Sequence, residues 1–429
     1  MASVETAASA AASTSEAASA SEAATLQDGI YLQPGPLPKE LRLAVLDFAP
    51  GTGTVAAGAA VGAIYALLGE LREGVVRELA ATRPDEPDVE IDPGTFDFLL
   101  GYGASFFDPE RGLTAAARPD LLTPLAHPRG PFASLRWAPG VPARSGEGDL
   151  CLQLTGRDSH AVGRALVEIW KLIADERLPL TIRESFDGFA RDDGRSWIGF
   201  HDGVSNIRPS QRLAAVRCTG DPDWNRGGTY LAFLRCAVDL PAWRELTREE
   251  QEVLVGRDKL SGCALERVDT VDGRLVPRPF AGCPATATAT PEELDVFRDP
   301  PETGDPILES SHIHRSNQNR SEPTTAAGHR IFRQGYEYLE PMTATAPGLG
   351  LNFVSFQSSL EHVRQILGLS SWLGGVNFGG RTPGSGAAGP EPIEIVDLRA
   401  GGFFVVPPRA RPFPGAELFG TFDTSPRHA

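Results

Sequence analysis

The sequence lacks the features that mark several large classes of protein. Its five cysteines are an odd number, are widely spread and include no Cys-x-x-Cys pair. Neither a disulfide framework nor a zinc site is therefore expected, and a reducing compartment is favoured. No uninterrupted apolar run approaches the roughly 18 residues that predict a membrane span. The formal net charge is −16, so nucleic-acid binding is not expected, because phosphate backbones need clustered Lys and Arg.

The composition that is present is typical of a globular protein. The chain has 429 residues, of which 41% are hydrophobic and 22% are charged. At about 150 residues per domain, this length predicts two or three domains and a large core. Residues 1–25 are mostly Ala and Ser and carry no basic side chain. We expect a disordered tail there rather than a signal peptide, and a cytoplasmic location follows from that expectation.

The spacing of apolar residues predicts a similar order of elements in each half of the chain. The first half has the order strand, helix, strand, strand, helix, at residues 41–49, 59–79, 96–102, 149–154 and 159–174. Ser159 is the expected N-cap of the last of these helices. The second half shows strand, helix, strand, helix, strand at residues 229–240, 244–255, 352–357, 359–367 and 402–406. The first order fits a ferredoxin-like unit, and the second repeats it loosely.

We therefore predict an α+β protein with two ferredoxin-like domains in tandem, each an antiparallel sheet with peripheral helices. The first domain is expected at residues 26–195 and the second at residues 196–429. Residues 266–306 are rich in Pro, Thr, Asp and Gly. This composition predicts an inserted loop within the second domain.

Three polar segments of the second half contain candidate functional residues. In the first, Asp202 lies between glycines in the run Gly199–Asn206, where a tight loop can bring its backbone close to a ligand. Asp-Gly is also a common turn, so both interpretations stay open. In the third, Arg330 and Arg333 are flanked by apolar and aromatic residues. A partly buried Arg needs a partner, which is either a ligand or a structural ion pair.

The second segment, residues 311–317, contains His312 and His314. A neutral imidazole can ligate iron through one ring nitrogen. On a strand the two histidines would face the same side, and with a carboxylate they could bind a non-haem metal. A surface or core histidine without a ligand is the third interpretation, and these residues alone leave all three open.

In order and spacing, the three segments resemble the dye-decolourising peroxidase family. The family motif Gly-x-x-Asp-Gly is matched at residues 199–203, its proximal histidine segment at residues 311–317, and its Arg-x-Gly-x-x-Tyr pattern at Arg333, Gly335 and Tyr338. Further family-like segments follow in order along nearly the whole chain, at residues 27–30, 101–107, 228–231, 256–262, 350–353 and 401–408. The resemblance implies a haem peroxidase that binds one haem b per chain in its second domain.

The resemblance also implies roles for single residues. His312 would be the axial ligand of the haem iron, with Asp202 and Arg333 as catalytic residues on the opposite side. Asp202 would carry a proton between the oxygens of hydrogen peroxide, and Arg333 would stabilise negative charge on the departing oxygen. Since an ordinary carboxylate has a pKa of about 4, an acidic activity optimum is expected unless burial raises that pKa. The remaining expected cofactor contacts are Asn206, Arg320, Leu351, Phe353 and Phe356.

Motif position favours His312 over His314, and Gln334 in place of a frequent second Arg favours Arg333 over Arg330. A carboxylate or carbonyl should accept the other N–H of the axial histidine. Glu361 is our choice for that partner. The segment 206–209, Asn-Ile-Arg-Pro, and the segment 317–320, Asn-Gln-Asn-Arg, depart from the family pattern. These departures concern contacts to the haem propionates more than the axial ligand.

The implied partners are hydrogen peroxide and an organic reductant such as a dye or a phenolic, with no nucleic acid and no membrane span. A homo-oligomer is left open. Bulky reductants would be oxidised through Trp197, Tyr336 or Tyr338, unless these aromatics only pack. Two further functions stay open: a haem-handling protein of the deferrochelatase type, and a haem oxidase specialised for one metabolite. Asp202 and Arg333 argue against a pure haem carrier, because binding alone needs neither.

Overall fold

The fold is seen in a computed structural model that describes residues 25–33, 35, 37–77, 83, 85, 96–125, 135, 137–220, 222–283, 303–316, 330–341, 348–367, 378–381 and 390–420. The expected disordered tail falls on residues 1–24, outside the described part. Thr25 is described, and its hydroxyl donates to the Gly227 carbonyl at 3.0 Å.

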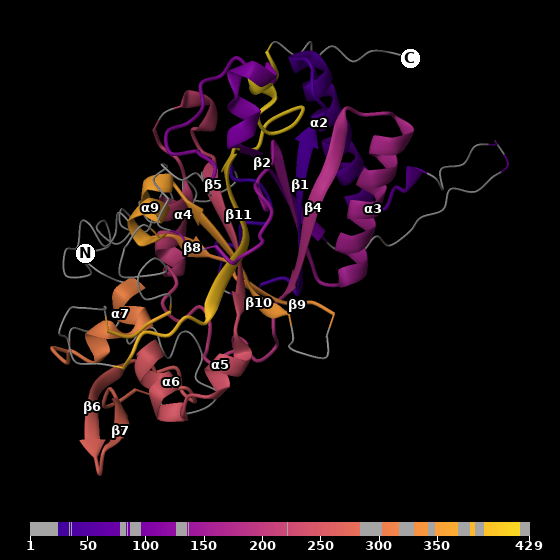
Figure 1. The fold of residues 1–429 in the computed structure, drawn as a ribbon. Helices are drawn as coiled ribbons and strands as arrows, with labels where there is room; N and C mark the ends of the chain where they lie inside the picture. The colour runs from indigo at the N-terminus through magenta and orange to yellow at the C-terminus, as the bar shows by residue number, and fades with distance from the viewer. Residues whose placement is uncertain are drawn as a thin grey trace, which may run out of the picture.

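The first half of the chain has the order strand, helix, strand, strand, helix, strand (Figure 1). Its elements are β1 (Glu40–Phe48), α2 (Thr54–Arg72), β2 (Phe96–Gly103), β3 (Leu150–Gly156), α3 (Ser159–Asp175) and β4 (Leu180–Phe189). The strands pair in the order β2-β3-β1-β4, all antiparallel. This is the ferredoxin-like unit that the sequence predicted. The N-cap of α3 is Asp158 rather than the expected Ser159, since the Asp158 carboxylate accepts from the Ala161 amide at 2.8 Å.

The second half repeats this topology with more elements inserted. Its ferredoxin-like strands are β5 (Thr229–Val238), β9 (Tyr336–Leu339), β10 (Leu349–Gln357) and β11 (Val396–Val406), and the short β8 (Phe332–Arg333) also pairs with β10. The order β11-β5-β10-β9 mirrors that of the first half. Its helices are α4 (Pro209–Val216), α5 (Leu240–Arg244), α6 (Arg248–Val255), α7 (His312–Ser316) and α9 (Leu360–Leu367).

The two halves join into one closed barrel. Strand β4 pairs with β9, β11 pairs with β2, and β10 pairs with β5 as well as β9, so eight of the described strands close on themselves. Alternate side chains of these strands fill the interior. They include Leu43, Val45, Phe233, Phe356 and Phe404. The other strand face packs against helices α2, α3 and α9 in a larger outer core.

One expectation from the sequence needs correction here. Part of the segment expected to be an inserted loop, residues 266–306, forms an antiparallel hairpin of β6 (Leu265–Val271) and β7 (Arg274–Pro279). Residues 284–302 lie outside the described part.

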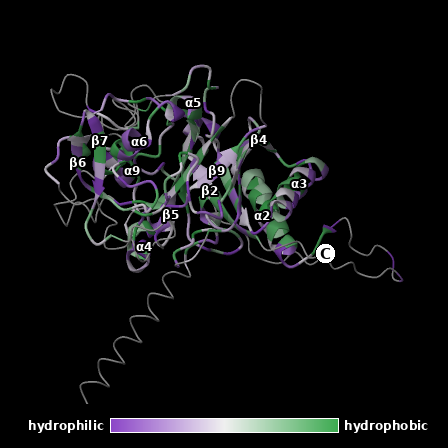
Figure 2. Ribbon diagram, turned by 90° about the horizontal axis from the view of Figure 1, so that it is seen from below, coloured by the Kyte–Doolittle hydropathy of each residue, from purple (hydrophilic) through white to green (hydrophobic). Residues whose placement is uncertain are grey.

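Helix α2 is long and apolar enough, by length and composition alone, to cross a membrane, and it is largely green in Figure 2. In this fold it is a core helix, because its buried side chains pack on the sheet.

Candidate active site

The Asp202 loop lies between β4 and α4 and is held by its own backbone. Arg195 and His201 form an antiparallel bridge across it. The Asp202 amide donates to the Gly194 carbonyl at 2.9 Å, and the Gly203 amide donates to the Asp202 carboxylate at 2.7 Å. Gly203 has φ +77°, which a side chain would disfavour. The segment is thus an Asp-Gly turn, and the turn holds an exposed carboxylate that a ligand could reach. The two interpretations of this segment are compatible.

The side chain of Asn206 links this loop to Arg333. Its amide nitrogen donates to the Arg333 carbonyl at 2.7 Å, and its oxygen accepts from the Arg333 amide at 3.1 Å. These bonds fix the backbone of Arg333 relative to the turn that holds Asp202. Asn206 is therefore a residue that positions the arginine, a role that motif matching did not assign to it.

A glycine brings the Asp202 carboxylate next to the arginine segment. A Cβ at Gly335 would lie 3.2 Å from the Asp202 carboxylate oxygen and 3.1 Å from the Leu351 side chain. Any larger residue would therefore have to displace one of these groups. The Gly in the Arg-x-Gly pattern keeps Asp202, Leu351 and the Arg333 strand together.

The strand register decides which predicted contacts share a face with Arg333. Arg333 pairs with Ser355, and side chains alternate along β10, so Leu351 and Phe353 lie on the same face as Arg333. Phe356 pairs with Phe332 and is fully buried in the barrel interior. The prediction that Phe356 contacts the cofactor is therefore wrong, since that side chain points to the opposite face. Arg320 lies outside the described residues.

His312 is the first residue of helix α7, and its ring is tightly held. Its Nδ1–H donates to the Phe378 carbonyl at 2.9 Å, and the two rings stack with centroids 4.5 Å apart and planes 12° from parallel. A Cβ at Gly379 would lie 2.8 Å from the Leu254 carbonyl and 3.4 Å from the His312 amide. Only a glycine fits easily at this approach.

The Nδ1 partner of His312 is thus a backbone carbonyl and not the Glu361 carboxylate chosen from the sequence. The Glu361 oxygens accept from Arg364 and Gln365 on its own helix. A carbonyl serves the same purpose, because it fixes the tautomer in which Nε2 carries the lone pair of a metal ligand. No sequence signal identified Phe378, which lies 66 positions further along the chain.

The electrostatic surroundings keep His312 neutral. Burial lowers its pKa to about 4, and the positive charge of Arg333 adds to this effect, while the hydrogen bond to Phe378 opposes it. Arg333 and His312 are therefore near enough to interact, although they come from different elements. A neutral imidazole is the form that binds iron.

His314 does not share a face with His312. Both lie in helix α7 rather than on a strand, and His314 is buried with its Nδ1 hydrogen-bonded to the Ser311 hydroxyl at 2.8 Å. Within the described part of the chain, no group of three or more His, Cys, Asp or Glu residues could hold a metal ion. The non-haem metal interpretation therefore loses its geometric basis.

The three aromatics near the site differ in exposure. Tyr336 and Tyr338 are 1% exposed, so they are not surface residues. Trp197 is partly exposed, and its indole N–H donates to the Tyr338 carbonyl at 3.0 Å. All three make packing contacts in this fold. Their part in electron transfer stays a prediction.

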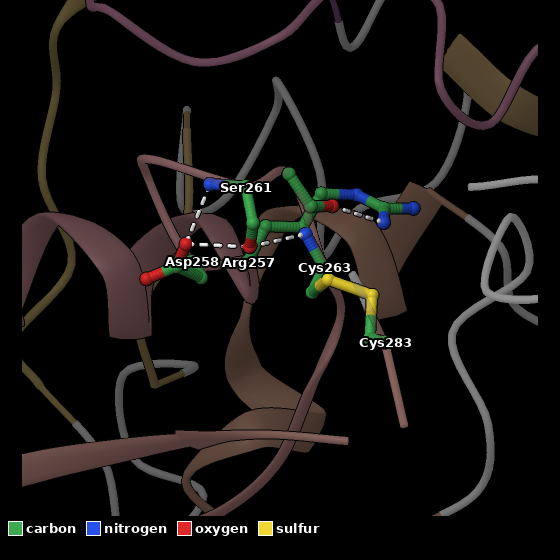
Figure 3. Close-up of a disulfide and its surroundings, with 6 residues drawn as sticks. Arg257, Asp258, Ser261, Cys263 and Cys283 are labelled. Carbon is green, nitrogen blue, oxygen red and sulfur yellow. Dashed lines mark hydrogen bonds between the residues drawn. A yellow bond between two sulfur atoms is a disulfide. The ribbon is translucent and has the colours of Figure 1, made fainter. Parts of the chain in front are cut away.

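A disulfide lies beside the Asp202 loop, although the number and spacing of the cysteines predicted none. Cys263 and Cys283 are bonded, with Cα atoms 6.0 Å apart (Figure 3). The loop before Cys263 is tied internally, because the Asp258 carboxylate accepts from both the amide and the hydroxyl of Ser261 at 2.6 Å. Cysteines 151, 218 and 236 are free thiols.

This disulfide loop also contacts the Asp202 loop directly. The Arg257 guanidinium donates to the Gly262 carbonyl at 2.9 Å and to the Ser205 hydroxyl at 2.6 Å. Cys263 packs against Val204. Residues 256–262 are one of the family-like segments, and their contacts support the Asp202 loop.

Comparison with known proteins agrees with this fold. Over 92% of its length the chain superposes on 96% of the DyP-type peroxidase from Cellulomonas bogoriensis, with a TM-score of 0.64 and 22% identity. Ferric DtpA from Streptomyces lividans gives a TM-score of 0.63, with 22% identity over 93% of this chain and 99% of that one. The chain thus has the architecture of tandem ferredoxin-like barrel proteins, with its polar site in the second half.

Sequence comparison matches part of the chain to a family model. Residues 193–376, which contain Asp202, His312 and Arg333, match the family described as Dyp-type peroxidase, C-terminal. By this match, which covers less than half of the chain, and by its fold, the chain is similar to the Dyp-type peroxidase family. It is also 29% identical over 286 residues to the deferrochelatase of Escherichia coli O6:K15:H31 (strain 536 / UPEC). That match covers 63% of this chain but only 59% of the relative, so less than two thirds of the relative's length is represented.

Proposed function

We propose that this chain is a haem-dependent peroxidase that reduces hydrogen peroxide and oxidises an organic reductant such as a dye or a phenolic. The single observation that carries the proposal is the link between Asp202 and Arg333 through the side chain of Asn206. An acid and a cation held together in this way match the two tasks of peroxide cleavage: proton transfer and charge stabilisation.

The residues at the site fit one haem b. His312 is neutral and its Nδ1–H donates to the Phe378 carbonyl, so its Nε2 lone pair would hold the haem iron. Leu351 and Phe353 supply an apolar wall on the face of Arg333. When bound, haem supplies the iron that activates peroxide.

The protein's own groups then act on the peroxide. Asp202 accepts a proton from one peroxide oxygen and returns it to the other, so that no net proton is lost. Arg333 stabilises the negative charge that grows on the departing oxygen. Asn206 holds the Arg333 backbone in place, and His312 would hold the haem iron.

The direct experiment is a dye-oxidation assay on haem-loaded protein. Decolourisation of an anthraquinone dye should require hydrogen peroxide and the loaded protein together. A protein that binds haem but oxidises neither dye nor phenolic at any pH between 4 and 9 is not this peroxidase.

The deferrochelatase relatives favour a second candidate function, the removal of iron from haem. The two functions differ in their need for peroxide. Iron released from bound haem without peroxide, measured with a ferrous chelator, would support the second candidate. A haem oxidase specialised for one metabolite differs from the first proposal only in its reductant, and a panel of phenolic and non-phenolic reductants separates them.

Compartment and assembly belong to the same proposal. A cytoplasmic location is part of this proposal. The Cys263–Cys283 disulfide weighs against it, since disulfides persist mainly in oxidising compartments. A homo-oligomer also remains a proposal, which sedimentation of the loaded protein tests.

A further inference from the structure

Glu337 is a buried carboxylate on the face of the barrel that carries Arg333. It lies in β9 and is only 6% exposed. It pairs with Leu351 on β10 and with Phe189 on β4. Because Leu351 shares a face with Arg333, Glu337 also lies on that face. The mechanism proposed above does not use this group.

Glu337 and Asp202 meet at the same point of the fold. Gly335 lies two residues before Glu337, and a Cβ there would be 3.2 Å from the Asp202 carboxylate and 3.1 Å from Leu351. Leu351 is also the cross-strand partner of Glu337. The two carboxyl groups are near enough for the charge of Asp202 to disfavour ionisation of Glu337.

The loop that carries Asp202 is fastened to the strand that carries Glu337. Trp197 donates from its indole nitrogen to the Tyr338 carbonyl, and its backbone amide bonds to the Glu337 carboxyl group. The Trp197 ring meets Phe189 edge-on at 6.0 Å and lies under the Arg191 guanidinium at 4.9 Å. These contacts hold the loop against β9 at Trp197, five residues before Asp202.

We propose that Glu337 is a positioning residue that stays a neutral carboxylic acid beside Asp202, and that its ionisation at alkaline pH slows proton transfer by Asp202. This inference rests on the proposed peroxidase function. With Glu337 neutral, the site holds one carboxylate charge. A second negative charge would hold the returning proton more tightly on Asp202 and would oppose the negative charge growing on the departing oxygen.

The charges around Glu337 agree with this role. Burial is the main cause that raises its pKa to about 8, and the charge of Asp202 raises it further. The Trp197 amide and the positive charge of Arg191 oppose the rise, while Asp193 adds to it. All these groups come from the loop after β4, while β4 and β10 place Phe189 and Leu351 opposite Glu337.

The test is the pH profile of dye oxidation by the haem-loaded protein and its Glu337→Gln variant. Wild-type activity should fall above about pH 8, by roughly tenfold per pH unit once the ionised form dominates. Glu337→Gln mimics the neutral acid and should keep its activity through this range. If the variant loses activity over the same pH range as the wild type, the inference is wrong.

Glu340→Gln is the matched control, because Glu340 follows β9 immediately but is exposed and pairs with Arg235. It should retain the wild-type alkaline fall. Should Glu337→Gln fail to fold, Glu337→Leu removes the same titration with an apolar side chain at the same buried position. Circular dichroism of each variant establishes which of them is folded.

A second readout does not depend on haem. Infrared spectra of the full chain should show a protonated carboxylic acid near pH 7 that disappears around pH 8 and is missing from the folded Glu337 variant. No such band in the wild type at pH 7 would overturn the inference. Failure of dye oxidation at every pH would instead overturn the proposed peroxidase function and leave the infrared result to decide the state of Glu337.

Discussion

The two halves of the barrel share one topology but differ in what lies between their strands. The first half connects its strands with two long helices of 19 and 17 residues that pack on the sheet. The described helices of the second half have eight residues or fewer. The Asp202 loop precedes β5, the first strand of the second half, and the connections of that half carry the β6–β7 hairpin and the His312 helix. Asp202, His312 and Arg333 thus lie outside the eight barrel strands that the two halves share.

The largest expected effect comes from a change confined to the second half. Asp202→Asn removes the proton acceptor, and dye oxidation should fall by about 10²–10⁴-fold while haem binding remains. Steady-state rates and the haem spectrum measure the two properties separately. An Asp202→Asn enzyme within threefold of wild type would show that the carboxylate has no role.

A change in the first half should affect stability and leave the chemistry unchanged. Ile64 in α2 is 5% exposed and packs in the outer core. Ile64→Ala should lower the free energy of unfolding by about 2–5 kcal/mol, through lost burial and a cavity. Denaturant unfolding measures this loss. The rate per folded, haem-loaded molecule should be unchanged, and a tenfold loss would break the contrast between the halves.

The disulfide distinguishes the halves in a smaller way, since its 20-residue span lies wholly in the second half. Replacing both Cys263 and Cys283 with Ala should lower the free energy of unfolding by about 2–4 kcal/mol. A thiol reductant should lower the stability of the wild type by a similar amount and have no effect on the double variant. If the reductant lowered the stability of both proteins equally, its effect would not come from the Cys263–Cys283 disulfide.

The smallest effect is expected from Asn206, whose side chain links the Asp202 loop to Arg333. Asn206→Ala removes both bonds to the Arg333 backbone. Catalysis should fall roughly tenfold, because small misplacements of catalytic groups are costly. Asn206→Asp is the matched variant, because it keeps the acceptor oxygen but loses the donor. Its rate should lie between that of the wild type and that of Asn206→Ala. Unchanged rates in both variants would remove the positioning role.

The sequence predicted the elements whose pattern is local. Strands β1, β2 and β5 and the helices of the first half follow from apolar spacing within single segments. Thr247 and Glu250 form a capping box that begins α6 and splits the helix expected at residues 244–255. The two-residue β8 and the β6–β7 hairpin were missed, because the first is too short and the second is rich in turn residues.

Contacts between segments that lie far apart in the sequence could not be predicted from it. The Phe378 carbonyl on His312, the Cys263–Cys283 bond and the Asn206 link to Arg333 all join positions separated by 20 or more residues. Motif resemblance named Asp202, His312 and Arg333, but it could not say how they are held. It also placed Phe356 at the cofactor, because the face of a strand residue depends on register.

The central claim is that His312 holds haem in a peroxidase site, and an absorption spectrum of the purified full chain tests it most directly. Haem-loaded wild type should show a strong Soret band that shifts when hydrogen peroxide is added. His312→Ala should fold normally but lose or displace that band, because the axial nitrogen is gone. A His312→Ala protein with a wild-type Soret band and a wild-type response to peroxide would contradict the account.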